Sequence, residues 1–103
     1  MAYTLVVELE WDPGKARLNE QKHGLSFEEA RELFLGTADY LEIYDRTHSL
    51  DEDRFIAIGP VQRGLICVVY VERVEDRIRL ISARFATRQE HRLFMEYMEG
   101  RLP

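Results

Sequence analysis

The run from Leu65 to Val71 is the part of the sequence that most restricts the fold. Its residues are almost all apolar, several are β-branched, and no charged side chain interrupts them. Such a run is typical of a strand whose two faces are both covered by other elements. The sequence therefore predicts a sheet in which this strand is central.

Four further strands are predicted around this run. Apolar and polar residues alternate from Tyr3 to Trp11, with the period of two that is typical of a half-buried strand. Three other segments have strand-like composition and are bounded by turn-forming residues. They are Tyr40 to Tyr44, Arg54 to Ile58 ending at Gly59-Pro60, and Arg77 to Phe85.

Three helices are predicted from their capping signals. The first follows an Asp and begins with Pro, and the other two open with Ser or Thr followed three residues later by Glu. The helices run from Pro13 to about Lys22, from Ser26 to Gly36, and from Thr87 to near Gly100. The elements together predict an α+β fold: a strand, two helices, four mostly antiparallel strands and a final helix.

The composition is typical of one ordinary globular domain. The chain has 103 residues, of which 46% are hydrophobic and 32% charged, so we expect a single domain spanning residues 1–103. The single cysteine, Cys67, lies in the apolar run and cannot form an internal disulfide, which favours a reducing compartment. No leader-like N-terminus or membrane-length apolar stretch is present. We therefore expect a cytoplasmic protein without a membrane segment.

The charge is distributed unevenly along the chain. The formal net charge is −5, which argues against indiscriminate binding of nucleic acid. Residues 25–53 carry −7 and should repel RNA, whereas residues 77–103 carry +3. From charge alone, both regions could equally be solvated faces.

Arginines cluster where the strand from Arg77 to Phe85 passes into the last helix. Arg84 falls at the strand end and Arg88 in the first helical turn, where unpaired backbone N–H groups favour negative charge. A phosphate is the natural ligand of such a place. Counting alternate residues puts Arg84 on the strand face of Ile78, Leu80 and Ser82, and puts Arg79 on the opposite face.

The last helix is predicted to be amphipathic. A helical wheel puts Leu93, Phe94, Tyr97 and Met98 on one side. The other side carries a cationic strip of Arg88, His91 and Arg92. Exposed helix faces are usually charged, so this strip alone does not indicate a binding site. Its position next to Arg84 makes a functional role as plausible as a structural one.

Several other side chains could serve either structure or chemistry. Glu90 lies on the apolar side of the last helix, and we expect it to cap that helix, with pairing to an arginine or a chemical role as alternatives. Lys22 and His23 complement the dipole at the end of the first helix, yet they could contact a phosphate and carry a proton. Trp11 is expected to pack in the core, with base stacking second. His48 lies in a polar loop that has no structural need for an imidazole.

The sequence gives no support for a metal or another cofactor. His23, His48 and His91 are far apart in the sequence, and no motif pairs histidine with carboxylate at ligand spacing. Nucleotide-binding loops and nucleophile elbows are also missing from the sequence. An enzyme built from this chain would work with arginine, lysine and histidine.

Four blocks of residues follow one another in a specific order and spacing. They are Glu10-Trp11-Asp12 with Lys15, Asn19 and Lys22-His23-Gly24; Phe27-Glu28-Glu29-Ala30; His48-Ser49 with Arg54-Phe55 and Ile58-Gly59; and Arg79 to Arg84 with Ala86-Thr87-Arg88 and Glu90. Through these blocks the sequence resembles, nearly end to end, the BrnT toxin family of bacterial type II toxin-antitoxin systems. Members of that family look like RelE-fold ribonucleases, so the resemblance implies a RelE-like form of the α+β fold.

The resemblance also implies an endoribonuclease that inhibits translation without a metal. In RelE-like enzymes the neighbouring 2′-hydroxyl attacks the phosphodiester, so the protein supplies a base, an acid and cations around the transition state. Arg84, Arg88 and Arg54 are the expected cations, because guanidinium binds phosphate through two hydrogen bonds. Lys22, His23 and His48 are unranked candidates for proton transfer. Expected RNA contacts are Trp11, Arg79, His91 and Arg92.

The family resemblance implies an antitoxin partner as well. This would be a BrnA-like protein with a ribbon-helix-helix part, which would bind operator DNA on behalf of the pair in a hetero-oligomer. The acidic region 25–53 suggests that the antitoxin surface is basic.

The sequence departs from the family pattern at one position and leaves other functions open. Phe94 stands where many relatives have a tyrosine, so a hydroxyl is missing unless Tyr97 replaces it. A catalytically inactive binding module that acts through its antitoxin is therefore the alternative. A third alternative is an enzyme that acts on small anions.

Overall fold

The computed structural model describes residues 8–73 and 76–101, and within these ranges it contains three helices and five strands. In chain order the elements are β1 (Glu8–Glu10), α1 (Pro13–His23), α2 (Phe27–Leu35), β2 (Leu41–Tyr44), a short 3₁₀ helix η1 (Arg46–His48), β3 (Arg54–Val61), β4 (Gly64–Arg73), β5 (Arg77–Phe85) and α3 (Arg88–Met98). The predicted strand that starts at Tyr3 lies partly outside the described residues. No helix in the described ranges is long and apolar enough to cross a membrane.

The three helices begin and end where their capping signals predict. Asp12 accepts a hydrogen bond from the N–H of Lys15, and Gly24 ends α1 with a φ of 68°, a left-handed conformation that favours glycine. Ser26 and Thr87 each form a complete capping box with the glutamate three residues later. Local side-chain chemistry therefore fixes the helix boundaries.

The sheet contains the four mostly antiparallel strands that were predicted after the helices, and the first predicted strand joins it as a fifth. Its order is β1-β5-β4-β3-β2. β2, β3, β4 and β5 pair antiparallel, and β1 joins the outer edge of β5 in parallel. β4 is the middle strand, as its apolar run predicts. β1 pairs with a strand about 70 residues later in the chain. A local sequence pattern cannot predict a contact between such distant residues.

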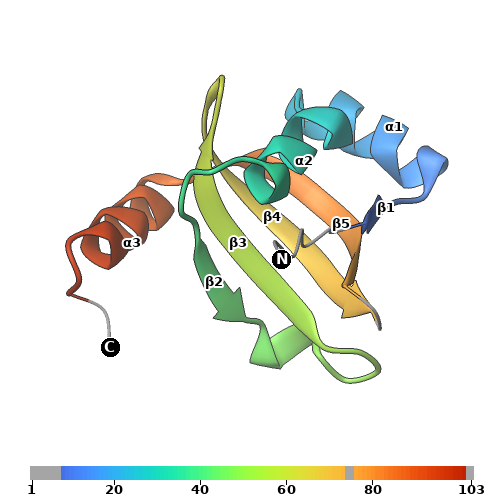
Figure 1. Cartoon of the computed structure of the whole chain (residues 1–103). Helices are drawn as coiled ribbons and strands as arrows, with labels where there is room; N and C mark the ends of the chain where they lie inside the picture. The colour runs from blue at the N-terminus through green and yellow to red at the C-terminus, as the bar shows by residue number, and fades with distance from the viewer. Residues whose placement is uncertain (1–7, 74–75, 102–103) are drawn as a thin grey trace, which may run out of the picture.

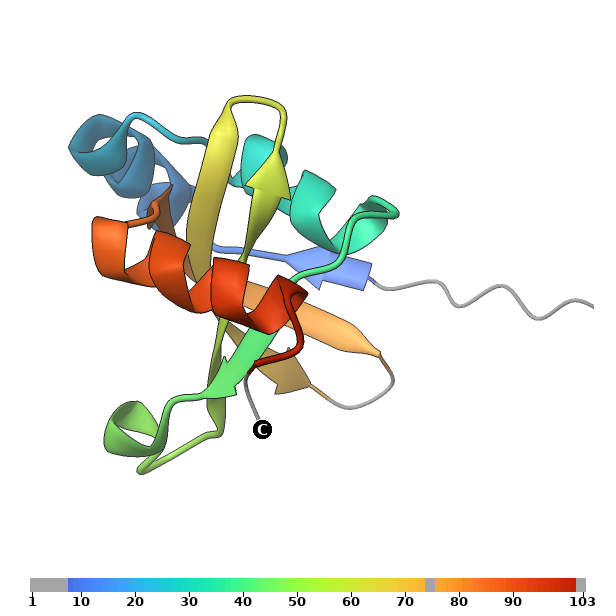
Figure 2. The same cartoon turned by 90° about the vertical axis from the view of Figure 1, so that its left-hand side faces the viewer.

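Two apolar clusters pack on opposite faces of the sheet. α2 covers one face, where Phe27, Ala30 and Leu33 contact sheet residues that include Val68 and Leu80. α3 covers part of the other face, where Phe94 packs near Ile58 and Cys67. Figure 1 shows α1 and α2 on one side of the strands and α3 on the other, and Figure 2 shows α3 crossing in front of the sheet.

β3 continues beyond the predicted stop at Gly59-Pro60. Its pairing with β4 runs to Val61, and Pro60 is exposed near the end of the hairpin, where a missing N–H costs little. Gly59 is required by close packing. A Cβ atom at this position would lie 2.6 Å from the Leu33 Cδ1 and from the Tyr40 Cβ. Glycine here lets α2 and the start of β2 lie directly on the strand.

Candidate active site

The junction of β5 and α3 is organised around Glu90. The Glu90 carboxylate accepts hydrogen bonds from both terminal nitrogens of Arg84, at 2.7 and 2.9 Å, and from the N–H of Thr87 at 2.8 Å. The capping role expected for Glu90 is confirmed, and the pairing with an arginine accompanies it. Arg84 is therefore held in one orientation at the start of α3, with 38% of its side chain exposed.

This pairing sets the charge state of the junction. Hydrogen bonds from Arg84 are the main reason why the pKa of Glu90 is lowered to about 2, although partial burial opposes the shift. Cys67 lies opposite Arg84 on β4, and burial raises the pKa of its thiol to about 12. The cysteine is thus a protonated core residue, as the sequence predicts.

A β-bulge in β5 corrects the predicted strand faces. Val69 pairs with Ser82 and the next residue, Tyr70, pairs with Leu80, so Ile81 is an extra residue that reverses the alternation. Counting alternate residues placed Arg79 and Arg84 on opposite faces, and this prediction was wrong. Because of the bulge, Ile78, Leu80 and Ala83 all belong to the apolar cluster beneath α2. Arg79, Ser82 and Arg84 lie on the opposite face of the sheet.

The bulge gathers cationic side chains on the face turned away from α2. Residues opposite one another in the register share a face, and Arg54, Val71 and Arg79 form one such row across β3, β4 and β5. Two strand spacings separate the backbones of Arg54 and Arg79, about 10 Å. We call Arg54, Arg79, Ser82 and Arg84 the arginine face. All four are half-buried.

α1 lies against the edge of β5 because of Asn19. The buried Asn19 amide donates to the carbonyl oxygen of Ala83 at 2.8 Å and accepts from the Ala83 N–H at 3.0 Å, as a neighbouring strand would. This contact brings Lys22 and His23 beside the bulge. They line a hollow of about 230 Å³ whose other residues are Lys15, Leu18, Asn19, Ile81 and Ser82. The two predicted proton carriers therefore adjoin the arginine face.

His48 adjoins the arginine face from the opposite side. It lies at the end of η1, where its Nδ1 is 2.9 Å from an Asp45 carboxylate oxygen. Its side chain is 66% exposed. His48 and Arg54 line one hollow of about 270 Å³, together with Thr47, Leu50, Asp51 and Glu52. The structure thus brings His48 and Arg54 to the same hollow.

Trp11 packs at the edge of the core and also lines a surface hollow, the two environments that were considered for it. Its ring packs edge-on against Phe27, with centroids 5.9 Å apart, at the border of the α2 cluster. It also lines a hollow of about 450 Å³ with Arg79, Glu10, Asp12 and Pro13. A half-buried tryptophan beside an arginine is a platform on which a base could stack.

The outer side of α3 matches the helical wheel except near its end. Arg88, His91 and Arg92 are exposed and Phe94 is buried, as predicted. Met98 was expected on the core side but is 52% exposed, because α3 ends there and extends past its apolar cluster. The Tyr97 hydroxyl donates to the Asp39 carboxylate at 3.1 Å, so it is engaged at the far end of the helix.

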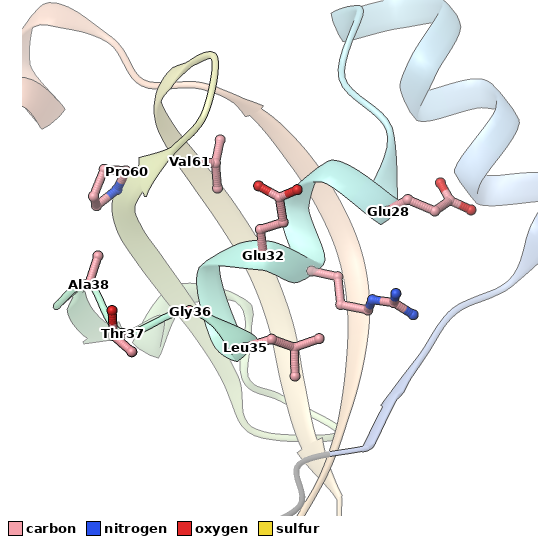
Figure 3. Close-up of a pocket in the computed structure, with 9 residues that line it drawn as sticks. Glu28, Glu32, Leu35, Gly36, Thr37, Ala38, Pro60 and Val61 are labelled. Atoms are coloured by element: carbon pink, nitrogen blue, oxygen red, sulfur yellow. The ribbon is translucent and has the colours of Figure 1, made fainter.

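Sequence reasoning missed three features of these surroundings. Ser82 on the arginine face and Asn19 at its border carry no local signal beyond their place in the blocks of the resemblance. The third is a groove of about 650 Å³ on the α2 side, beside Glu32 and Val61 (Figure 3). Within the described ranges, no three His, Cys, Asp or Glu side chains gather as a metal ion would need.

The fold and these residues define a class: a small α+β protein whose mixed sheet presents arginines, with lysine and histidines at their border. Residues 11–90 match the family described as "Ribonuclease toxin, BrnT, of type II toxin-antitoxin system". The chain belongs to this family of ribonuclease toxins, and a toxin of this type has an antitoxin partner.

A solved structure supports the assignment. The 1.1 Å crystal structure of the Brucella abortus ribonuclease toxin BrnT superposes with a TM-score of 0.59 and 28% sequence identity. The match covers 81% of this chain and 100% of that chain. A comparison with curated proteins gave no match.

Proposed function

We propose that this toxin cleaves RNA on the arginine face without a metal, and that this cleavage inhibits translation. The observation that carries the proposal is the bulge at Ile81, which turns Arg79 and Arg84 to the same face as Arg54 and places Ser82 beside α1. Guanidinium groups there would hold the scissile phosphate and stabilise its extra negative charge in the transition state. Arg88, His91 and Arg92 extend the contact along α3, and Trp11 with Arg79 would hold a base.

The chemistry needs a base and an acid on opposite sides of the phosphorus. The ribose 2′-oxygen bonds to phosphorus as its proton passes to the base, and the bond to the 5′-oxygen breaks as the acid protonates that oxygen. Lys22 and His23 adjoin β5, whereas His48 adjoins β3, with β4 between them. One group from each side would serve the in-line reaction. The products are a 2′,3′-cyclic phosphate and a 5′-hydroxyl.

The antitoxin that we propose is a BrnA-like ribbon-helix-helix protein with a basic contact surface. Residues 25–53 of the toxin carry −7, which favours a partner of opposite charge. The pair would form a hetero-oligomer in the cytoplasm and would contact operator DNA through the antitoxin.

One experiment tests the chemistry. Purified toxin is incubated with RNA in excess EDTA, and the new ends are identified. We expect cleavage to persist and to leave 5′-hydroxyl ends that polynucleotide kinase labels without prior dephosphorylation. Cleavage that stops with EDTA and returns with Mg²⁺ contradicts the proposal. The folded double variant Arg84→Ala, Arg88→Ala should be inactive. Persistent cleavage by this variant would reject a catalytic role for both residues.

An inactive module that acts only through its antitoxin is the second candidate. The Arg84 guanidinium is engaged by Glu90, Phe94 supplies no hydroxyl, and the hydroxyl of Tyr97 donates to Asp39. This candidate predicts antitoxin binding without RNA cleavage and no growth arrest when the toxin alone is induced.

A further inference from the structure

The groove beside α2 has both apolar and charged lining residues. It lies between the C-terminal part of α2 and the end of β3, and Leu35, Ala38, Pro60 and Val61 line it. Leu35 is 55% exposed although it is a large apolar residue. Figure 3 shows Glu32 and Val61 on facing elements of this groove. Exposed apolar surface of this kind commonly marks a contact with another protein.

Two glutamates and one arginine of α2 line the groove. Glu28 and Glu32 lie one turn apart on α2, where like charges destabilise a helix. Arg31 lies between them in the sequence and also lines the groove, yet among residues 8–73 and 76–101 neither carboxylate forms an ion pair with it. Their neighbour Glu29 is paired with Arg63 at 2.7 Å. Glu28 and Glu32 are thus the carboxylates of this helix available to a partner.

The acidic surface continues past the groove. The lining segment Gly36–Ala38 leads directly into Asp39 and Tyr40. The pKa of the Tyr40 hydroxyl is raised by burial and then by the charges of Glu42, Glu72 and Asp39, all of which are acids. Glu42, Glu72 and Asp39 therefore add negative charge around Tyr40, beside the groove, which favours a cationic partner there.

We propose that this groove is the docking site of the antitoxin, and that a basic amphipathic segment of the antitoxin occupies it. An apolar side chain of that segment would rest on Leu35 and Val61, and a lysine or arginine would lie between Glu28 and Glu32. The proposal rests on the proposed basic antitoxin. It separates the partner contact from the arginine face, because the groove adjoins α2 and the arginine face is turned away from α2.

The test compares charge and shape variants with matched controls. The probe is the proposed ribbon-helix-helix antitoxin, purified from the gene adjacent to the toxin gene and titrated onto each toxin variant. Glu32→Lys and Leu35→Asp should each weaken binding about 100-fold. Glu20→Lys reverses an exposed charge on α1, and Met98→Asp alters a residue that is similarly exposed, at 52%. Both controls should stay within about threefold of the unaltered chain.

The two docking variants should keep the RNA cleavage rate of the unaltered chain, so antitoxin co-expression should no longer relieve their growth arrest. Unchanged binding by both folded variants overturns the docking site. Failure of the antitoxin to bind the unaltered chain also overturns it, as does a change in self-association of the toxin with no loss of antitoxin binding. Absence of RNA cleavage by the unaltered chain rejects the proposed function instead and leaves the binding comparison valid.

Discussion

Asn19 shows how a single side chain positions a site. β1 pairs with Arg77 to Arg79, and the Asn19 amide bonds to both backbone groups of Ala83 farther along the same edge. The amide also donates to the carbonyl oxygen of Leu25 at 3.0 Å. One residue thus joins α1, the loop that follows it and β5, and this contact sets Lys22 and His23 beside Ser82.

Replacing Asn19 with alanine should lower the free energy of unfolding by about 2–4 kcal/mol, because buried backbone groups lose their partners. Urea unfolding measures the change, and Gln21→Ala on the exposed side of α1 is the control. A loss under 0.5 kcal/mol would show that the amide does not hold the edge.

Glu90 makes the stability of the junction dependent on pH. Its pKa is about 2 in the folded chain against an ordinary value of 4.5, so the folded state favours the charged carboxylate. The stabilisation is therefore complete above about pH 4.5 and is lost as pH falls towards 2. Glu90→Gln should lower the free energy of unfolding by about 1–3 kcal/mol at pH 7.

The measurement is urea unfolding of Glu90→Gln and the unaltered chain between pH 7 and the lowest pH at which both fold. The difference between them should shrink as the pH decreases below 4.5. A difference that is constant over this range would mean that the carboxylate charge is not what Arg84 stabilises.

At the scale of elements, signals that involve neighbouring residues were reliable. Asp12, Ser26 and Thr87 predicted the helix starts because each cap involves residues three apart in the chain. Gly24 predicted the end of α1 for a similar local reason. The apolar run of β4 predicted its central place because both of its faces are covered.

Features that depend on distant strands could not be predicted in this way. The bulge at Ile81 exists only in the pairing of β5 with Val69 and Tyr70, and the place of β1 depends on the edge of β5. The prediction that Arg79 and Arg84 lie on opposite faces of β5 was therefore wrong, because it did not count the extra residue at the bulge. The candidate residues could be proposed from their chemistry alone, but their grouping around Ser82 and Arg54 required the register.

Packing of α2 on β3 should be sensitive to Gly59. Its Cβ in Gly59→Ala would meet Leu33 and Tyr40 at 2.6 Å, so the elements must separate. We expect thermal and urea unfolding to show a loss of about 1–3 kcal/mol. Gly14→Ala, in the first turn of α1, serves as the control: its Cβ would lie 3.1 Å from the Asp12 Oδ2, at the end of a side chain that can shift, so the loss should stay under about 0.5 kcal/mol. Equal stability of the two variants would contradict the close approach of α2 to β3.

At the scale of the whole molecule, the acidic residues of the block 25–53 lie in two places: Glu28 and Glu32 line the groove beside α2, whereas Asp51 and Glu52 line the hollow of His48 and Arg54. The arginine face is turned away from α2, and the acidic groove with Glu28 and Glu32 lies beside α2. An RNA substrate and a basic antitoxin could thus bind different surfaces of a chain whose net charge is −5. The overall charge alone conceals this division.

The RNA cleavage rate of alanine variants of Arg54 and Arg79 shows whether the reaction takes place on the arginine face. Each substitution should lower kcat/KM about 100-fold, because each removes a cation from the transition state. Arg17→Ala, which removes an exposed arginine from α1, should retain the full rate. If the folded double variant Arg54→Ala, Arg79→Ala cleaves RNA as fast as Arg17→Ala does, the reaction does not take place on this face.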